Sequence, residues 1–310
     1  MTADQIQIAK RRKFSIWMQA VRAFSFTASM TPVLLGGMLA LTFDGEVAWR
    51  LYPIVIICSL LYHAATNLIS DYFDFKRQVD RDYTFGSSRV LVEGLLTPKQ
   101  ILAASWLLFG IATALGFILI AERGFPMLVL GVVGLLGGYL YTGNPVGYKY
   151  VALGDFLVFT LMGPLMVIGS YFALTGSYSS TVLFASLPIG FLVAAILHAN
   201  NTRDIIHDAE AKVKTLANIL GHRAAKVEYY VLVFGAYLSI IIMVFTKTIS
   251  PWSLLVLLSL PPALKNIKAI AASQPGKPEN IAILDVQTAQ LHLLFGLLFS
   301  ISLILQAIIS

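Results

Sequence analysis

Three side chains able to bind a cation lie at the end of a long apolar stretch. The segment NLISDYFDFKRQVDR places Asn67, Asp71 and Asp74 at positions i, i+4 and i+7. This spacing puts all three on one face of a helix. Carboxylates in a segment otherwise suited to lipid are costly unless they face the protein interior and are paired there. The spacing therefore predicts a ladder of oxygen atoms that points into the protein.

A second segment, HANNTRDIIHDAEAKVKTLA, repeats the pattern with Asn200, Asp204 and Asp208 at i, i+4 and i+8. Four predicted membrane crossings separate the two ladders, and an even number of crossings preserves the direction of the chain. Both ladders should therefore end on the same side of the membrane. The repeated Asn and Asp also leave open a parallel internal duplication.

The two ladders predict a magnesium site. Side by side they would repel each other unless a cation lay between them, although each acid taken alone could be a solvated helix end. Oxygen ligands without Cys or paired His suit a hard cation such as Mg²⁺, which commonly bridges carboxylates to substrate phosphates. We predict that the metal ligands, which are also the catalytic acids, are Asp71, Asp74, Asp204 and Asp208.

Basic residues near the ladders could stabilise a departing diphosphate. The candidates are Lys76, Arg89, Lys149, Arg203 and Arg22. The usual excess of Lys and Arg on the cytoplasmic side is the alternative explanation for most of them. Arg22 differs because it falls inside the first apolar segment, where an arginine needs an anionic partner or a polar cavity.

The composition indicates an integral membrane protein. Hydrophobic residues make up 57% of the 310 residues, charged residues only 12%, and the mean hydropathy is +0.78. A membrane-spanning helix needs about 20 residues. The sequence predicts an all-α bundle with nine such segments, at residues 17–42, 50–73, 98–120, 125–142, 151–174, 182–207, 227–247, 250–270 and 288–309.

The distribution of charge predicts the orientation. With a cytoplasmic N-terminus, eighteen of the 22 Lys and Arg residues lie on the cytoplasmic side and three on the other. This bias favours a cytoplasmic active site in the cell membrane. The single cysteine, Cys58, cannot form an intrachain disulfide, and no soluble basic region is present that would bind nucleic acid. We expect residues 1–310 to form one domain; the oligomeric state is left open.

Both motifs resemble those of the UbiA superfamily of intramembrane prenyltransferases. The segments NLISDYFDFKRQVD and NNTRDIIHDAEAKVKTLANILG are similar to its first and second Asp-rich motifs. The first motif, with acids at +4, +7 and +13 after Asn67, looks most like the 1,4-dihydroxy-2-naphthoate polyprenyltransferase branch. GSSRVLVEGLLTP and YTGNPVGYKYVALGDFLVFTLMGPLMVIGSY look like the same branch, although Lys149 stands where many relatives have an uncharged residue.

The resemblance implies a Mg²⁺-dependent transfer of a polyprenyl group from an allylic diphosphate to an aromatic acceptor. In the naphthoate branch the prenyl group replaces the carboxylate, which leaves as CO₂, and the product is a demethylmenaquinone. The resemblance also implies substrate-binding roles. Asn67 and Asn200, or Asn201 instead, would orient a ligand or diphosphate oxygen, with packing or local capping as the alternative role for each.

Five further residues are weaker candidates. Asp80 could extend the metal site or be a solvated loop acid, and His63, one turn before Asn67, could meet the aromatic substrate or be structural. Tyr141, with Tyr139 and Tyr148, could steady a cation through its ring, although interfacial tyrosines usually anchor a helix in the membrane.

Three rival functions remain. A UbiA-type enzyme could use another acceptor, such as 4-hydroxybenzoate or a glycerol phosphate. A cation transporter would place its acids near the membrane midplane, often on broken helices, whereas these acids lie at helix ends. A non-catalytic partner subunit would be expected to have lost an acid, and both ladders are intact.

Overall fold

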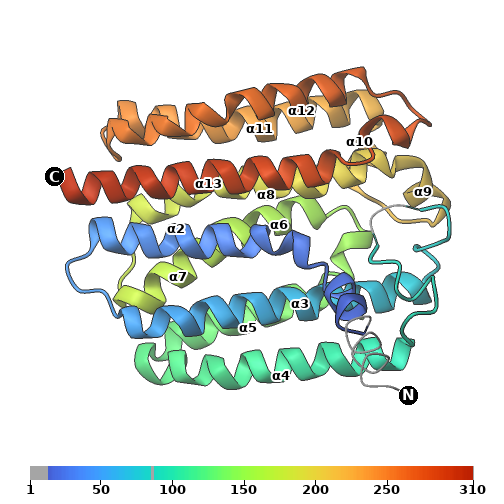
Figure 1. The fold of residues 1–310 in the computed structure, drawn as a ribbon, viewed down its shortest axis with the longest axis horizontal. Coiled ribbons are helices and arrows are strands. Elements are labelled where there is room, and N and C mark those ends of the chain that lie inside the picture. Colours follow the sequence, from blue (N-terminus) through green and yellow to red (C-terminus); the bar gives the residue numbers. More distant parts are fainter. Residues whose placement is uncertain (1–12, 85–86, 310) are drawn as a thin grey trace, which may run out of the picture.

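The computed structural model describes residues 13–84 and 87–309, and long helices dominate it. They lie side by side along the longest axis of the molecule, and the short helices α9 and α10 lie at one end (Figure 1). After a helical stretch at 13–20, the elements are η1 (Ala23–Phe26), α2 (Thr27–Phe43), η2 (Trp49–Leu51), α3 (Tyr52–Lys76), α4 (Pro98–Arg123), α5 (Phe125–Leu140), η3 (Tyr148–Tyr150), α6 (Gly154–Thr160), η4 (Leu161–Leu165), α7 (Met166–Thr175), α8 (Ser180–Arg203), α9 (Ile205–Glu210), α10 (Leu216–Leu220), α11 (His222–Phe245), η5 (Pro251–Ser259), α12 (Leu260–Ala272), η6 (Pro278–Ile281) and α13 (Leu284–Ile309).

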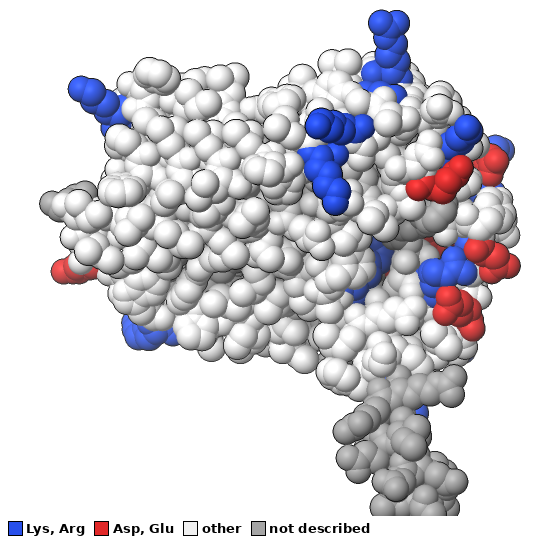
Figure 2. All heavy atoms as spheres, turned by 45° about the horizontal axis from the view of Figure 1, so that its top comes forward, with Lys and Arg blue, Asp and Glu red and all other residues white. Residues whose placement is uncertain are grey.

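The helices confirm the predicted multi-pass membrane architecture. Within the described residues, eight helical segments are long and apolar enough to cross a membrane, and α5 is a shorter ninth. Figure 2 shows most of the charged side chains toward one end of the molecule, several of them around a hollow, with a few at the other end and a long flank that is largely uncharged. This distribution suits a flank that faces lipid and a charged end that faces water.

Two predicted helices are interrupted. The segment predicted at 17–42 breaks at Val21 and Arg22, where Arg22 adopts φ 53° and ψ 52° and precedes η1. The placement of Arg22 inside the first helix was therefore wrong. The segment predicted at 182–207 ends at Arg203, and Asp208 belongs to the separate helix α9. Asn200, Asp204 and Asp208 are thus not on one continuous helix.

Local sequence explains several helix ends. Thr97 caps α4 together with Gln100: the Gln100 amide donates to Thr97 Oγ1 and the Thr97 amide donates to Gln100 Oε1. Such a capping box satisfies two of the unpaired amides at a helix N-terminus. Gly124, at φ 70°, separates α4 from α5 with a backbone conformation that favours glycine. The turn makes α4 and α5 antiparallel neighbours.

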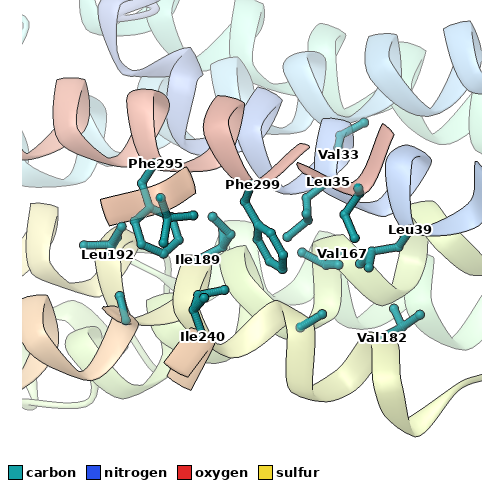
Figure 3. Packing of buried hydrophobic residues seen from close by; sticks show 14 of the residues in the cluster. Val33, Leu35, Leu39, Val167, Val182, Ile189, Leu192, Ile240, Phe295 and Phe299 are labelled. Atoms are coloured by element: carbon teal, nitrogen blue, oxygen red, sulfur yellow. The ribbon is translucent and has the colours of Figure 1, made fainter. Parts of the chain in front are cut away.

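The main core lies between α2, α7, α8, α11 and α13. Phe295 and Phe299 of α13 pack against side chains from the other four helices, among them Leu35 of α2 and Ile189 of α8 (Figure 3). Gly296 allows close contact between α13 and α2, because a Cβ added there would lie 2.0 Å from Thr31 Cγ2. Beside this tightly packed region lies a cavity, whose wall includes polar residues of α3, of α8 and of the loops.

Candidate active site

A cavity of about 580 Å³ extends through the bundle from its charged end. This volume lies in the range of ordinary small-molecule sites. The charged end is lined by cations, acids, amides and a tyrosine: Arg22, Asn67, Asp80, Tyr141, Lys149, Asn200, Asn201, Arg203, Asp204 and Asp208. Deeper in the bundle the lining is apolar, with Val33, Val55, Leu119, Met127 and Leu130 among its residues. The cavity suits a ligand with a charged head and a long apolar tail.

The two acids of α3 are buried behind basic residues of the cavity wall. Asp71 is paired with Arg22 and also accepts a hydrogen bond from Ser88. Asp74 accepts hydrogen bonds from Lys149 Nζ and from the Tyr150 hydroxyl, each at 2.7 Å. Both carboxylates are at most 2% exposed, and neither is among the described residues that line the cavity. The two carboxylates therefore do not face the cavity themselves; they bind Arg22 and Lys149, which do.

These ion pairs hold both cations in their charged form. Burial alone would favour the neutral amine of Lys149, but the carboxylate of Asp74 raises the pKa of Lys149 well above its ordinary value. Burial likewise opposes the charge of Arg22, and the carboxylate of Asp71 raises the pKa of that guanidinium. Both side chains line the cavity as permanent cations.

Asn67 and His63 position the turn that carries Arg22. The Asn67 side-chain amide donates to the Val21 carbonyl at 2.9 Å and to Ser25 Oγ at 3.2 Å. His63 lies in the cavity wall, with one ring nitrogen 2.5 Å from Ser29 Oγ and the other 3.2 Å from Ser25 Oγ. Two residues of α3 thus fasten the left-handed turn against the cavity.

The second motif forms a cluster around Arg203. Its guanidinium donates to both carboxylate oxygens of Asp204, at 3.0 and 2.8 Å, and to Asp285 Oδ2 at 2.9 Å. The same guanidinium donates to Asn200 Oδ1 at 2.8 Å. Asn200, Asp204 and Arg203 therefore belong to one network, which Asp285 of α13 completes.

Asp80 and Asp208 are the acids of the cavity that lack such pairing. Within the described residues neither carboxylate has a hydrogen bond or an ion pair. Burial raises the pKa of Asp80 to about 7, and the neighbouring charge of Asp74 adds to the effect. Burial also raises the pKa of Asp208 to about 7; Lys149 opposes this shift and Asp204 adds to it. An added cation would stabilise both ionised carboxylates.

The oxygen-only donor set of the cavity fits Mg²⁺. Asp80, Asp204 and Asp208 line the cavity, and two of them have a charge that is not compensated by a partner in the described chain. Carboxylates and substrate phosphates are the usual ligands of this ion. The assignment of the four predicted ligands stays a prediction: Asp71, Asp74 and Asp204 are each bound to a basic side chain, and Asp71 and Asp74 also lie outside the described cavity lining.

Three predicted site residues lie elsewhere. Lys76 is exposed and lies over the ring of Tyr72, and Arg89 pairs with Glu93 on the protein surface. Neither is among the described residues of the cavity wall, and their assignment to substrate binding stays a prediction. The cytoplasmic charge bias is the alternative explanation for both. Tyr139 packs against Phe73 and Trp106, outside the cavity lining, whereas Tyr141 and Tyr148 belong to that lining.

A buried network behind Asn201 was not predicted. The Asn201 amide donates to both oxygens of Asp155, at 3.4 and 3.2 Å, and His198 Nδ1 lies 3.3 Å from the same carboxylate. His198 Nε2 bonds to the Ala225 carbonyl at 2.8 Å, and Glu228 approaches Nδ1 to 3.6 Å. Asp155, His198 and Glu228 are also the group in the described chain whose ligand atoms lie close enough to hold a metal.

This network joins α6, α8 and α11. It lies outside the cavity lining of the described chain except at Asn201, which it holds in place. One feature of the sequence could have indicated this network: Asp155 is a charged residue at the start of an apolar segment.

Comparison with known sequences identifies close relatives. The model of the UbiA prenyltransferase family matches residues 29–305. The chain is 34% identical over 290 residues to 1,4-dihydroxy-2-naphthoate octaprenyltransferase of Bacillus subtilis (strain 168), covering 94% of this chain and 92% of that protein. It is also 34% identical over 298 residues to human UbiA prenyltransferase domain-containing protein 1, covering 95% and 85%.

Solved structures share the fold. A UbiA homolog from Archaeoglobus fulgidus, bound to GPP and Mg²⁺, superposes with a TM-score of 0.62 over 92% of this chain and 99% of that chain, at 16% identity. The apo structure of a UbiA homolog from Aeropyrum pernix K1 gives a TM-score of 0.60 over 92% and 98% of the two chains, at 13% identity.

Proposed function

Because the chain belongs to the UbiA prenyltransferase family, we propose that it transfers a polyprenyl group from an allylic diphosphate to 1,4-dihydroxy-2-naphthoate. The carboxylate of the acceptor would leave as CO₂, and the product would be a prenylated naphthoquinol, the reduced form of a demethylmenaquinone. The observation that carries the proposal is the cavity, whose charged end suits a diphosphate and whose apolar depth suits a prenyl tail.

The basic residues of the cavity would stabilise the diphosphate as it leaves. Lys149 and Arg22 are permanent cations in a largely buried site, where charge interactions are stronger than in water. Their present partners, Asp74 and Asp71, hold them in place before substrate arrives. Bound Mg²⁺ would neutralise the diphosphate oxygens, and Asp80, Asp204 and Asp208 are the cavity acids that would hold it.

The prenyl group becomes electron-deficient as the diphosphate departs, so it must be kept away from water. The apolar wall of the cavity, which includes Val33, Val55 and Leu130, would exclude water from the tail. Tyr141 and Tyr148, whose ring centroids are 5.3 Å apart, both line the cavity and would offer their ring faces to the developing cation.

The choice of acceptor is supported by the naphthoate relative from Bacillus subtilis and by the chemistry of the site. Attack by the carboxyl-bearing carbon breaks the aromaticity of the ring, and loss of CO₂ restores it. The carbon–carboxyl bond supplies the electron pair, so no base is needed to remove a ring proton. His63, held between Ser25 and Ser29, and the amides of Asn67 and Asn201 would orient the acceptor and diphosphate oxygens.

We place the charged end on the cytoplasmic side of the cell membrane, since most Lys and Arg residues lie there. The head-group chemistry would then occur at the rim of the membrane while the tail remains among apolar helices.

Purified protein should be offered 1,4-dihydroxy-2-naphthoate, 4-hydroxybenzoate and glycerol phosphate, each with an all-trans polyprenyl diphosphate and Mg²⁺. Mass spectrometry should detect a decarboxylated prenyl naphthoquinol as the main product. Product formed only from 4-hydroxybenzoate or only from glycerol phosphate would refute the proposed acceptor and leave the prenyl transfer itself intact.

A further inference from the structure

Glycines form part of the apolar wall of the cavity. Gly131 and Gly134 of α5 and Gly169 of α7 all line it, and a Cβ built on any of the three would meet no heavy atom within 4 Å. Gly137 and Gly138, nearer the charged end, differ: a Cβ there would lie 2.7 Å from Leu161 and 2.5 Å from Thr66. The open glycines are therefore confined to the deeper part of the cavity.

The cavity reaches almost to the opposite end of the bundle. Its lining includes Val55 near the start of α3, Leu119 near the end of α4, Met127 near the start of α5 and Ala173 near the end of α7. Each of these positions is within about one helical turn of its helix terminus. The open glycines thus lie along a channel that runs from the diphosphate end toward the far side of the membrane.

Helix α5 provides a scale for the depth of this channel. At about 1.5 Å a residue, Gly134 lies about 10 Å below Tyr141, Gly131 about 15 Å and Met127 about 21 Å. An extended isoprene unit is about as long as one turn of helix, roughly 5 Å. Counted from the diphosphate, Gly134 lies beside the second unit, Gly131 beside the third and Met127 beside the fourth.

We propose that the open glycines of α5, with Gly169 of α7, determine the length of prenyl tail that the channel accepts, and that the natural donor has at least four isoprene units. This inference rests on the proposed prenyl transfer. Any side chain larger than hydrogen at Gly131 or Gly134 would project into the space the tail occupies. Closing the channel at one turn of α5 would remove about one unit from the accepted length.

The test compares three variants with the wild type: Gly131→Phe, Gly134→Phe and the control Gly110→Phe. Gly110 lies on the exposed face of α4, outside the described cavity lining, and a Cβ there also meets nothing within 4 Å. For each variant, kcat/KM is measured with all-trans geranyl, farnesyl and geranylgeranyl diphosphates, which have two, three and four units, and 1,4-dihydroxy-2-naphthoate as acceptor.

In Gly131→Phe, kcat/KM for the four-unit donor should fall by about tenfold or more, while kcat/KM for the two-unit donor should stay unchanged. The phenylalanine ring would fill the channel beside the third unit, and the packed helices cannot move far enough to make room for it. Gly134→Phe should lose activity on the three-unit donor as well. Gly110→Phe should keep the wild-type profile. Equal losses of kcat/KM for all three donors, or unchanged profiles in both channel variants, would overturn the inference. The proposed function would still stand in either case if the wild-type protein turned the donors over.

A binding measurement separates the two proposals further. Without any acceptor, the three diphosphates should raise the melting temperature of wild-type protein, and the variants should lose this response at the same lengths as in the kinetic test. A length cut-off in binding combined with no turnover on the naphthoate would support the channel and refute the acceptor. Gly169→Phe, in α7, provides a second channel variant should Gly131→Phe fail to fold.

Discussion

Replacing Asp208 with Asn should stabilise the protein in the absence of divalent cations and at the same time reduce its activity. The wild-type carboxylate is buried, lacks a partner among the described residues and has a pKa raised to about 7. A raised carboxyl pKa means that the folded state opposes ionisation. The contribution of Asp208 to stability is therefore complete below pH 4, declines as the pH rises to 7, and stays lost at higher pH.

The pKa of Asp208 rises from about 4 in the unfolded chain to about 7, a difference of about three pH units. At about 1.4 kcal/mol for each pH unit, ionisation costs the folded state at most about 4 kcal/mol above pH 7. Asparagine keeps the shape and removes the charge. In chelator at pH 8 the melting temperature of Asp208→Asn should exceed that of the wild type by about 3 °C or more, and at pH 4 the two should agree.

The assay is thermal unfolding in detergent from pH 4 to pH 8, with and without Mg²⁺. Mg²⁺ should raise the melting temperature of the wild type more than that of Asp208→Asn, because a ligand stabilises the state that binds it. Turnover of the variant should fall by about 10²-fold. Glu210→Gln, an exposed acid of the same helix α9, is the control and should change little. A variant less stable than wild type in chelator at pH 8 would refute the reasoning.

The remaining predictions concern residues that hold the site together. Asp71→Asn and Asp204→Asn should each lower turnover by about 10²-fold with the protein still inserted; near-normal rates in both at limiting Mg²⁺ would argue against a shared site. Arg22→Leu should lower stability by about 3–5 kcal/mol, because it leaves the buried carboxylate of Asp71 without its cation. The double variant with Asp71→Asn should recover stability but not activity, and recovery of both would make the pair purely structural. His198→Ala should lower the melting temperature measurably by breaking the buried network of α6, α8 and α11, and an unchanged value would contradict that role.

The sequence was informative where the membrane itself constrains the chain. Apolar length predicted the spans because lipid requires helices of about 20 residues. The cost of charge in such a segment predicted that Arg22 needs an anionic partner or a polar cavity; Arg22 pairs with Asp71 and also lines the cavity.

Contacts between distant segments explain what the sequence did not predict. The break before η1 is fastened by Asn67 of α3, which donates to the Val21 carbonyl, and no local pattern encodes that bond. The pairing of Lys149 with Asp74 likewise joins residues 75 positions apart. Lys76 and Arg89 could not be distinguished from Lys149 by position along the chain, since the cytoplasmic charge bias places cations near both motifs.

The central claim is that this site joins a prenyl tail to a naphthoate ring at the carbon that loses CO₂. The most direct measurement uses purified protein, 1,4-dihydroxy-2-naphthoate labelled with ¹³C at the carboxyl carbon, and all-trans geranylgeranyl diphosphate. We expect labelled CO₂ to appear in step with diphosphate, one molecule of each per turnover, and the prenylated product to carry no label. Label retained in the prenylated product would contradict the claim.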